Sequence, residues 1–541
     1  MINKISGNIV DIVHNSIFPG TIKIKGGRIE EISKEKKEYK NYITPGFVDS
    51  HVHIESSMLT PSEFARIAVV HGTIAIVSDP HEIANVLGVE GIYYMLNNAS
   101  KVPFKFCFGA PSCVPASVFE TSGKKINKND IEKLLKNPKI GYLAEVMNYP
   151  GVINGDPEVI DKINIAKHYN KPIDGHAPGL IGKDLEKYIS RGISTDHECF
   201  TFSEALEKIK KGMKILVREG SAAKNFDELR PLLENNWKNC MLCSDDKHPD
   251  DLLKGHINLM VKKAIENKID PLKVLSTTSL NPKIHYNLDI GLLQTGDPAD
   301  FIIVDNLKDL NVLKTFINGV EVASKGISYI KRINPEIINN FEIKSKKPSD
   351  FSIKYTKGKI NVIVANEGQL ITDITQIEPT ISEGFVVSNI KKDILKIAVI
   401  NRYKESKPSI GFIKNFGLKK GAIASSVAHD SHNIIAVGIN DKDICNAVNL
   451  IIKSKGGISA VSQEKRDILP LPIAGIICDK PYDWVAKKYI DINKSVKTLG
   501  CKLKSPYMTL SFMALPVIPK LKITDKGLFD SEKFKFIPLL E

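Results

Sequence analysis

The feature that most constrains the fold of this chain is a series of apolar, strand-like runs, each ended by polar side chains, between residues 46 and 246. Helical patterns, such as those at 61–72 and 203–212, separate several of the runs. Near-continuous apolar strands are typical of a parallel sheet that is covered on both faces. Eight such runs with intervening helices predict an α/β fold, a (β/α)8 barrel of the TIM type over residues 45–284. The runs are GFVDSHVHI (46–54), GTIAIVSDP (72–80), FKFCFGAP (104–111), IGYLAEVMN (140–148), KPIDGHAPG (171–179), GISTDHE (192–198), MKILVREGS (213–221) and CMLCSDD (240–246).

The segments that flank the barrel have a different pattern. Residues 1–44 and 285–345 alternate apolar and polar residues around Gly- and Pro-containing turns, which is typical of short antiparallel strands. We therefore expect the two segments to form one small β-sandwich domain. A lysine-rich, proline-containing stretch at 344–350 ends this region. Residues 350–541 then combine strand patterns with at least one helical pattern and predict a separate C-terminal α+β domain.

Composition narrows the classes of function. The chain of 541 residues has 75 basic and 62 acidic residues, a net charge of +13, but its lysines are scattered among acids and asparagines. A groove for single-stranded nucleic acid needs basic residues interleaved with aromatic ones, so we expect no nucleic-acid partner. No apolar run approaches the ~18–20 residues of a membrane helix, and the first residues do not resemble a signal peptide. Eight cysteines are too few for a disulfide scaffold, which favours a cytoplasmic protein. We also expect a homo-oligomer, because symmetric homo-oligomers are common among soluble proteins.

Candidate ligands of a metal follow the predicted strands. His51 and His53 are two residues apart in an extended segment, so both imidazoles point to the same side. His-x-His alone is a weak signal. It gains weight because further ligand types follow other strands, at the end of the barrel where active sites form: Glu145, His176, His197 and Asp245. The alternative is that these are isolated buried polar residues, each satisfied by its own hydrogen bond.

Several stretches resemble a known family. ITPGFVDSHVHIESS (43–57) resembles the opening of the amidohydrolase superfamily of metal-dependent hydrolases. AEVMNYPGV (144–152), DGHAPG (174–179), TDHE (195–198) and SDDKHPDDL (244–252) are similar to the adenine deaminases in particular. The resemblance spans nearly the whole chain. It implies hydrolysis of adenine to hypoxanthine and ammonia, a reaction of purine salvage, with two divalent ions: manganese first, iron or zinc as alternatives.

The resemblance also implies a role for each ligand. His51 and His53 would bind one ion, and His176 and His197 the second. Glu145 would bridge the two, in the position that a carbamylated lysine takes in hydantoinases, because AEVMN contains no lysine.

Asp245 would complete the first ion's ligands and move a proton, so that Asp245 and Glu145 carry catalysis. Two divalent ions can lower the pKa of a water toward ~7, and a carboxylate can pass its proton to the leaving amine. Two alternatives stay open: another cyclic amidine or amide hydrolase of the imidazolone or hydantoin type, and a non-catalytic purine- or metal-binding protein.

Other residues are candidates for substrate contact. Asp246 would face the base and accept from a purine N–H, or else cap a loop. His81, after the second strand, is a candidate for a substrate or extra-metal contact. Arg218, Glu219 and Ser221, after the seventh strand, are candidates for the purine edge or for ordinary pairs at the barrel rim.

Two motifs resemble metal sites without the context that such sites need. His53-Ile54-Glu55 with Cys240-Met241-Leu242-Cys243 superficially matches the zinc deaminase signature, but the second motif lacks the proline and lies within an apolar strand, so both cysteines are predicted to be core. His429-Asp430-Ser431-His432 contains metal-ligand types, and we favour a turn before a strand. Asn85 and Glu120 are predicted to be surface residues.

Overall fold

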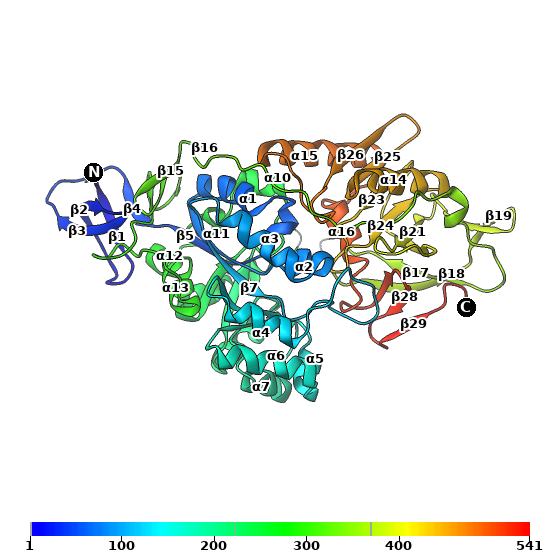
Figure 1. The fold of residues 1–541 in the computed structure, drawn as a ribbon, viewed down its shortest axis with the longest axis horizontal. Coiled ribbons are helices and arrows are strands. Elements are labelled where there is room, and N and C mark those ends of the chain that lie inside the picture. The colour runs from blue at the N-terminus through cyan, green and yellow to red at the C-terminus, as the bar shows by residue number, and fades with distance from the viewer. Residues whose placement is uncertain (1–2, 222, 368–369) are drawn as a thin grey trace. The chain divides into compact units, whose positions relative to one another are not determined.

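The chain folds into two compact units in a computed structural model that describes residues 3–221, 223–367 and 370–541 (Figure 1). Each unit is assembled from segments that are separated in the sequence. The domain limits predicted above stay predictions. Unit 1 comprises Met1–Pro80, Tyr93–Ser112 and Asn127–Ile333; unit 2 comprises His81–Ile92, Cys113–Ile126 and Asn334–Glu541.

The predicted eight parallel strands are present in unit 1, which confirms the α/β barrel. They form a five-stranded sheet in the order β5-β6-β7-β8-β9 and a three-stranded sheet in the order β10-β11-β12, so each strand pairs with the next one in the chain. All the pairs are parallel. The strands are β5 (Phe47–Val52), β6 (Thr73–Ser78), β7 (Lys105–Ala110), β8 (Ile140–Val146), β9 (Ile173–Gly175), β10 (Thr195–Asp196), β11 (Lys214–Arg218) and β12 (Cys240–Cys243).

Backbone hydrogen bonds join the two sheets at both ends. Ser194 N donates to Ile173 O (2.9 Å) between β9 and β10. Asp245 N donates to His51 O (2.9 Å), and Val52 and Asp245 form a parallel bridge beside β12 and β5. The strands therefore close into a ring, and their carboxyl ends meet at one mouth.

Helices follow most of the barrel strands, and their starts are visible in the sequence. Asp156 and Asp270 each precede a proline, and their carboxylates accept hydrogen bonds from Glu158 N and Leu272 N (2.9 Å each). A carboxylate cap followed by proline favours a helix start, and the cap stabilises the helix by about 1 kcal/mol. In chain order, the helices are α1 (Pro61–Ala68), α2 (His81–Leu87), α3 (Val89–Ala99), α4 (Lys128–Lys136), α5 (Tyr149–Asn154), α6 (Pro157–His168), α7 (Gly182–Ser190), α8 (Phe202–Lys210), α9 (Phe226–Asn235), α10 (Pro249–Lys254), α11 (Ile257–Glu266), α12 (Pro271–Thr277) and α13 (Leu280–Tyr286).

The layer between strands and helices is a continuous apolar core. Val217 of β11 and Leu242 of β12 are fully buried in one cluster with Phe226 and Leu229 of α9 and Val261 of α11. Burying a side chain of this size contributes about 1.5–3 kcal/mol each. This layer holds the strands in place and so positions the side chains at the mouth.

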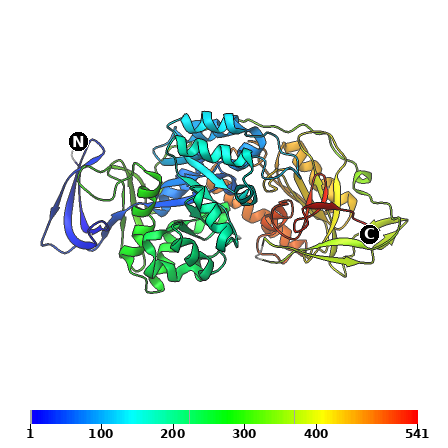
Figure 2. The same cartoon turned by 90° about the horizontal axis from the view of Figure 1, so that it is seen from below.

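The two flanks of the barrel contribute strands to one sheet, and the predicted limits of a β-sandwich domain stay a prediction. The order β16-β15-β14-β13-β4-β1-β2-β3 places strands from before the barrel beside strands from after it. Figure 2 shows the N-terminal strands in blue next to green strands of the later segment. Strands β4 and β13 pair antiparallel and join the two segments. The members are β1 (Asn3–Asp11), β2 (Ser16–Lys25), β3 (Arg28–Lys34), β4 (Tyr42–Pro45), β13 (Phe301–Val304), β14 (Val312–Ile317), β15 (Val320–Ser324) and β16 (Ile327–Ser328).

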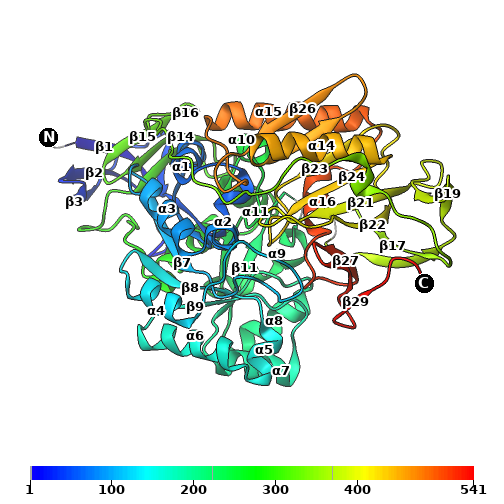
Figure 3. The ribbon, with the colours of Figure 1, turned by 45° about the vertical axis from the view of Figure 1, so that its right-hand side comes forward.

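Unit 2 is built on a second eight-stranded sheet, in the order β18-β17-β22-β21-β24-β23-β25-β26. Helix α14 (Asp441–Ser454) packs against β23, β24 and β25, and Ile444, Val448 and Ile451 on this helix are fully buried (Figure 3). The predicted α+β character is confirmed. The strands are β17 (Ile360–Val364), β18 (Asp373–Ile377), β21 (Ile394–Ile400), β22 (Ser409–Lys414), β23 (Ala422–Ser425), β24 (Ile434–Gly438), β25 (Gly457–Val461) and β26 (Arg466–Pro470).

Smaller elements complete unit 2. A hairpin, a three-stranded sheet and two further helices surround the central sheet. Within the described residues, no helix combines the length and apolar character needed to cross a membrane. The elements are β19 (Thr380–Ser382), β20 (Phe385–Val387), α15 (Tyr482–Thr498), α16 (Pro506–Phe512), β27 (Leu521–Thr524), β28 (Gly527–Asp530) and β29 (Lys535–Ile537).

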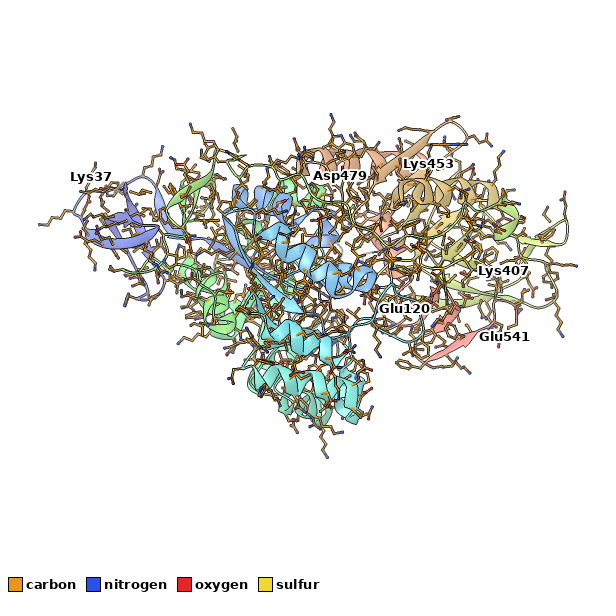
Figure 4. All side chains as sticks on the ribbon, viewed as in Figure 1. Lys37, Glu120, Lys407, Lys453, Asp479 and Glu541 are labelled. Carbon is orange, nitrogen blue, oxygen red and sulfur yellow. The ribbon has the colours of Figure 1, made fainter. Side chains whose placement is uncertain are left out.

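The prediction that Asn85 and Glu120 are surface residues is wrong. Asn85 is fully buried in α2, where its Nδ2 donates to His81 O (3.0 Å). Glu120, labelled in Figure 4, is 4% exposed, and burial raises the pKa of its carboxyl well above the usual value. Both residues belong to segments between barrel strands that are part of unit 2. Their polar side chains favour exposure, whereas packing within unit 2 buries both residues.

Candidate active site

The ligand-type side chains predicted at the strand ends lie together at the carboxyl ends of five barrel strands. Five of them are buried, and the sixth, His176, has 21% of its side chain exposed. Parallel strands in a closed ring bring their carboxyl ends to one mouth, which explains why residues far apart in the sequence meet there. This barrel site consists of His51 and His53 (β5 and just after it), Glu145 (β8), His176 (after β9), His197 (after β10) and Asp245 (after β12).

His51, His53 and Asp245 form one group within the barrel site. Nε2 of His51 lies 3.3 Å from Nε2 of His53 and 3.6 Å from Oδ1 of Asp245. Nε2 of His53 lies 3.2 Å from the same Asp245 oxygen. These three ligand atoms lie within 4.8 Å of one another, a spacing at which they can share a single ion.

Glu145 links this group to the other two histidines. Its Oε2 lies 2.8 Å from Nδ1 of His176 and 3.3 Å from Nε2 of His197. Its Oε1 lies 3.5 Å from Nε2 of His53. The two oxygens of this carboxylate therefore face the two groups of imidazoles, which is the arrangement required of a bridging ligand.

Contacts outside the barrel site orient its imidazoles. Nδ1 of His53 lies 3.1 Å from the carbonyl oxygen of Asp79. A carbonyl only accepts, so this contact is a hydrogen bond only when Nδ1 carries the proton, which leaves the Nε2 lone pair directed at Asp245. The backbone N–H of His176 donates to the Tyr188 hydroxyl (3.1 Å), which in turn donates to Val146 O (2.8 Å).

Arg218 and Glu198 form a buried pair beside the barrel site. Arg218 donates to both Glu198 oxygens (2.5 and 2.8 Å) and also to Oδ2 of Asp245 (2.5 Å). Glu198 Oε1 lies 3.4 Å from Nε2 of His197 and 3.7 Å from Nδ1 of His176. The guanidinium thus holds the Asp245 oxygen that faces away from His51 and His53. Glu198 was missed in the sequence, although its place directly after His197 at a strand end was an available signal.

Asp245 has a strained backbone, with a φ of 54°. The left-handed region is unfavourable for residues other than glycine and costs on the order of 1–3 kcal/mol. The strain is held by the backbone hydrogen bonds between Asp245 and residues 51 and 53. This backbone conformation directs the Asp245 carboxylate toward the imidazoles of His51 and His53.

Comparison with known proteins agrees with this geometry. The profile of the amidohydrolase family matches residues 42–322, and that of the adenine deaminase C-terminal domain matches residues 369–535. Curated adenine deaminases of Sulfurovum sp. and Borreliella burgdorferi are 53% and 52% identical, each over 99% of both chains. The adenine deaminase of Salinibacter ruber is 48% identical over 99% of this chain and 98% of its own. This chain belongs to the adenine deaminase family. As a member of the amidohydrolases, it is a hydrolase.

The donor set fits the metal dependence of this family. Overlapping groups of ligand atoms lie within 4.8 Å of one another and are made of imidazole nitrogens and carboxylate oxygens. Such donors suit divalent manganese, iron or zinc, and neutral imidazole is the form that binds. Three of these groups are His51/His53/Asp245, His51/Glu145/His197 and His176/His197/Glu198.

The pKa values of the barrel site follow from burial and from its charges. Burial and the neighbouring imidazoles lower the pKa of His51 well below its usual value, so this ring is neutral. Burial opposes ionisation of Glu145 and Asp245, but the charges of His176 and Arg218, respectively, outweigh it and hold both pKa values well below the usual range. Both carboxylates of this adenine deaminase family member are thus ready to bind cations at neutral pH.

We expect Arg218→Met to destabilise the folded chain by about 3–5 kcal/mol, because it leaves the Glu198 and Asp245 carboxylates buried without their counter-charge. Denaturant unfolding, monitored by circular dichroism, measures the loss. Arg191→Met removes an exposed arginine and is the matched control. A loss below about 1 kcal/mol, typical of an exposed ion pair, would contradict the role given to Arg218.

The remaining candidates around the barrel mouth have partners of their own. The Ser56 hydroxyl donates to Oδ1 of Asp246 (2.5 Å). The Ser221 hydroxyl donates to Asp251 Oδ2 (2.7 Å), and Glu219 lies 3.3 Å from Nζ of Lys263. Substrate contact by Asp246, Glu219 and Ser221 stays a prediction.

The structure also shows where the cysteine motif at 240–243 and the histidine motif at 429–432 lie. Cys240 and Cys243 are fully buried in β12, which confirms them as core residues. Residues 429–432 form a turn before β24, as predicted. His81 begins α2, and its Nε2 lies 3.7 Å from a carboxylate oxygen of Asp430. Substrate contact by His81 stays a prediction.

A buried network around Asp49 links the first and last barrel strands and was not found in the sequence. Asp49 accepts from Ser244 N (2.9 Å) and lies 2.7 Å from Nε2 of His256. His256 Nδ1 lies 2.8 Å from the Thr73 hydroxyl. The network ties β5 to β12 through groups whose partners are about 200 residues away, so no local pattern could reveal it.

Proposed function

We propose that this chain hydrolyses adenine to hypoxanthine and ammonia. The observation that carries the proposal is the barrel site itself: Glu145 faces both imidazole groups, in a chain about half identical over its full length to curated adenine deaminases. The reaction is hydrolytic. It breaks the bond between C6 and the exocyclic nitrogen, forms a bond from C6 to water oxygen and releases ammonia.

The residues would divide between two divalent ions. His51, His53 and Asp245 would hold one ion, His176 and His197 the other, and Glu145 would bridge them. When bound, the two ions would lower the pKa of a water between them toward about 7. The donor set supports a first-row divalent ion, and within that class we propose manganese.

Asp245 is the proton carrier in this proposal. Its Oδ2 is held by Arg218, while Oδ1 is directed at His51 and His53. Asp245 takes a proton from the attacking water and gives a proton to the departing amine, so the charge of the reacting groups stays balanced. General acid–base catalysis of this kind contributes about 10²–10⁴-fold.

Arg218 is better explained as a positioning residue than as a contact to the purine edge. Its guanidinium is buried and engaged with Glu198 and Asp245. It fixes the orientation of Asp245 and keeps that carboxylate ionised. Asp246, in contrast, is half-buried next to Asp245, and we propose that it accepts from a purine N–H.

We also propose a cytoplasmic homo-oligomer whose partners are adenine and water, without a nucleic-acid partner. All eight cysteines are free thiols, which supports a reducing compartment. The oligomer rests on the general frequency of symmetric assemblies.

The test is a panel of purines, pyrimidines and cyclic amides, offered to the manganese-loaded chain and assayed for ammonia release. We expect turnover of adenine at a rate of about 1–10³ s⁻¹, with Asp245→Asn as the inactive control. Ring opening of a hydantoin or imidazolone without ammonia release from adenine would favour another amidohydrolase activity. Binding of adenine without turnover of any compound would favour a non-catalytic protein.

A further inference from the structure

A second group of ligand-type side chains lies within unit 2. It consists of His81 and Glu82 at the start of α2 and of His429, Asp430 and His432 in the turn between β23 and β24. We call it the unit 2 cluster. All five residues are less than 5% exposed. Three imidazoles and two carboxylates are thus removed from water together, which is costly unless their charges and lone pairs are satisfied.

The ligand atoms of this cluster converge. Oε1 and Oε2 of Glu82 lie against Nδ1 of His429 and Nε2 of His432, respectively. Nε2 of His81 lies 3.7 Å from an oxygen of Glu82 and 3.7 Å from an oxygen of Asp430. Nδ1 of His429 lies 3.8 Å from the same Asp430 oxygen. Ligands of a tetrahedral ion with bonds of 2.0–2.2 Å lie about 3.3–3.6 Å apart, so small adjustments would let these atoms surround one ion.

Hydrogen bonding does not explain the cluster. Among the residues that the structure describes, neither oxygen of Glu82, neither ring nitrogen of His432, nor Oδ2 of Asp430 has a hydrogen-bond partner of acceptable geometry. Buried ion pairs stabilise a fold only when additional hydrogen bonds satisfy their remaining atoms. A cation between Glu82 and His432 would give these buried atoms the partner that hydrogen bonding does not supply.

The backbone of the turn is also strained at this point. His432 has a φ of 54°, in the left-handed region. For a residue other than glycine, such strain costs on the order of 1–3 kcal/mol and is typically found at functional sites. Here it belongs to the residue whose imidazole faces Glu82.

We propose that the unit 2 cluster is a third metal site, which binds one divalent first-row transition ion through Glu82, His429 and His432, with Asp430 and His81 completing the ligands. None of its five residues is among the six residues of the barrel site. It would cross-link α2 to the turn between β23 and β24 and so hold a segment from between two barrel strands in unit 2. Imidazole and carboxylate donors bind zinc more tightly than manganese, so the two sites need not carry the same metal.

Metal analysis of the full-length chain tests the proposal. After removal of metal and reloading with zinc, we expect about three ions per chain in the wild type and about two in Glu82→Gln/His432→Gln, because the barrel site keeps its pair. Glu186→Gln/His14→Gln changes exposed residues of the same types and is the matched control. Equal metal content in the folded double variant and in the wild type would overturn the proposal.

Anomalous diffraction from crystals of the zinc-loaded wild type shows whether the unit 2 cluster binds zinc, even where a variant does not fold. We expect a peak between Glu82 and His429, and its absence would refute the site. In Glu145→Gln, this peak should remain while the signal in the barrel weakens. Failure of the proposed deaminase activity would appear in the ammonia assay and would leave the peak unchanged, so the two failures are distinguishable.

Discussion

Asp245→Asn is expected to reduce adenine turnover by about 10³-fold or more while leaving the metal content nearly unchanged. Asparagine has the same shape and keeps an oxygen that can face His51 and His53, but it cannot take a proton from water at neutral pH. It also removes the negative charge that Arg218 holds at 2.5 Å. We therefore expect Asp245→Asn to lose deaminase activity while it still binds the metal ions.

Two measurements check this prediction: the steady-state rate of ammonia release and the metal content by elemental analysis. Asp184→Asn, on an exposed position of α7, is the matched control and should keep the wild-type rate. A near-normal rate in Asp245→Asn would contradict the proton-carrier role. A large loss of metal would show instead that Asp245 acts mainly as a ligand.

Glu145→Gln is expected to lower the metal content of the barrel site from two ions toward one and to abolish turnover. The carboxylate has one oxygen 2.8 Å from Nδ1 of His176 and the other 3.5 Å from Nε2 of His53. An amide presents one weak acceptor in place of two anionic oxygens. We expect the more weakly held ion to lose at least about 100-fold in affinity, which exceeds the usual effect of removing a residue that only supports a ligand.

Elemental analysis after dialysis against a weak chelator measures this loss, and the circular dichroism spectrum shows whether the chain is folded. Glu186→Gln serves as the control at an exposed position of α7. Full occupancy of two ions in Glu145→Gln would show that the imidazoles and Asp245 suffice, and that the bridging role is wrong.

Much of the barrel was predictable because its signal is local. Runs such as GTIAIVSDP carry an apolar strand and its polar end within nine residues, and β6 is found at Thr73–Ser78 inside that run. The topology of parallel strands then places all such ends at one mouth. For this reason, His51, Glu145 and His197 could be grouped before any contact between them was known.

Residues whose surroundings come from distant segments could not be predicted in this way. Asn85 and Glu120 are polar residues that were expected at the surface, yet packing within unit 2 buries them. Arg218 was a candidate for the purine edge or for an ordinary pair at the barrel rim, and the sequence did not show that its partners would be Glu198 and Asp245, which follow two other strands. Burial and pairing of this kind depend on which segments fold together.

By itself, the sequence determined the order of strands and helices and the residue types at the strand ends, because these depend on hydrophobic pattern and spacing along the chain. The family resemblance implied the division of the ligands and the bridging role of Glu145, whereas only the tertiary structure gave the distances between their atoms and showed that Arg218 donates to Asp245. The tertiary structure also brought α2 to the turn that contains His429 and His432. Distances of a few ångströms between residues up to 350 positions apart arise from packing and backbone geometry, which no stretch of sequence contains on its own.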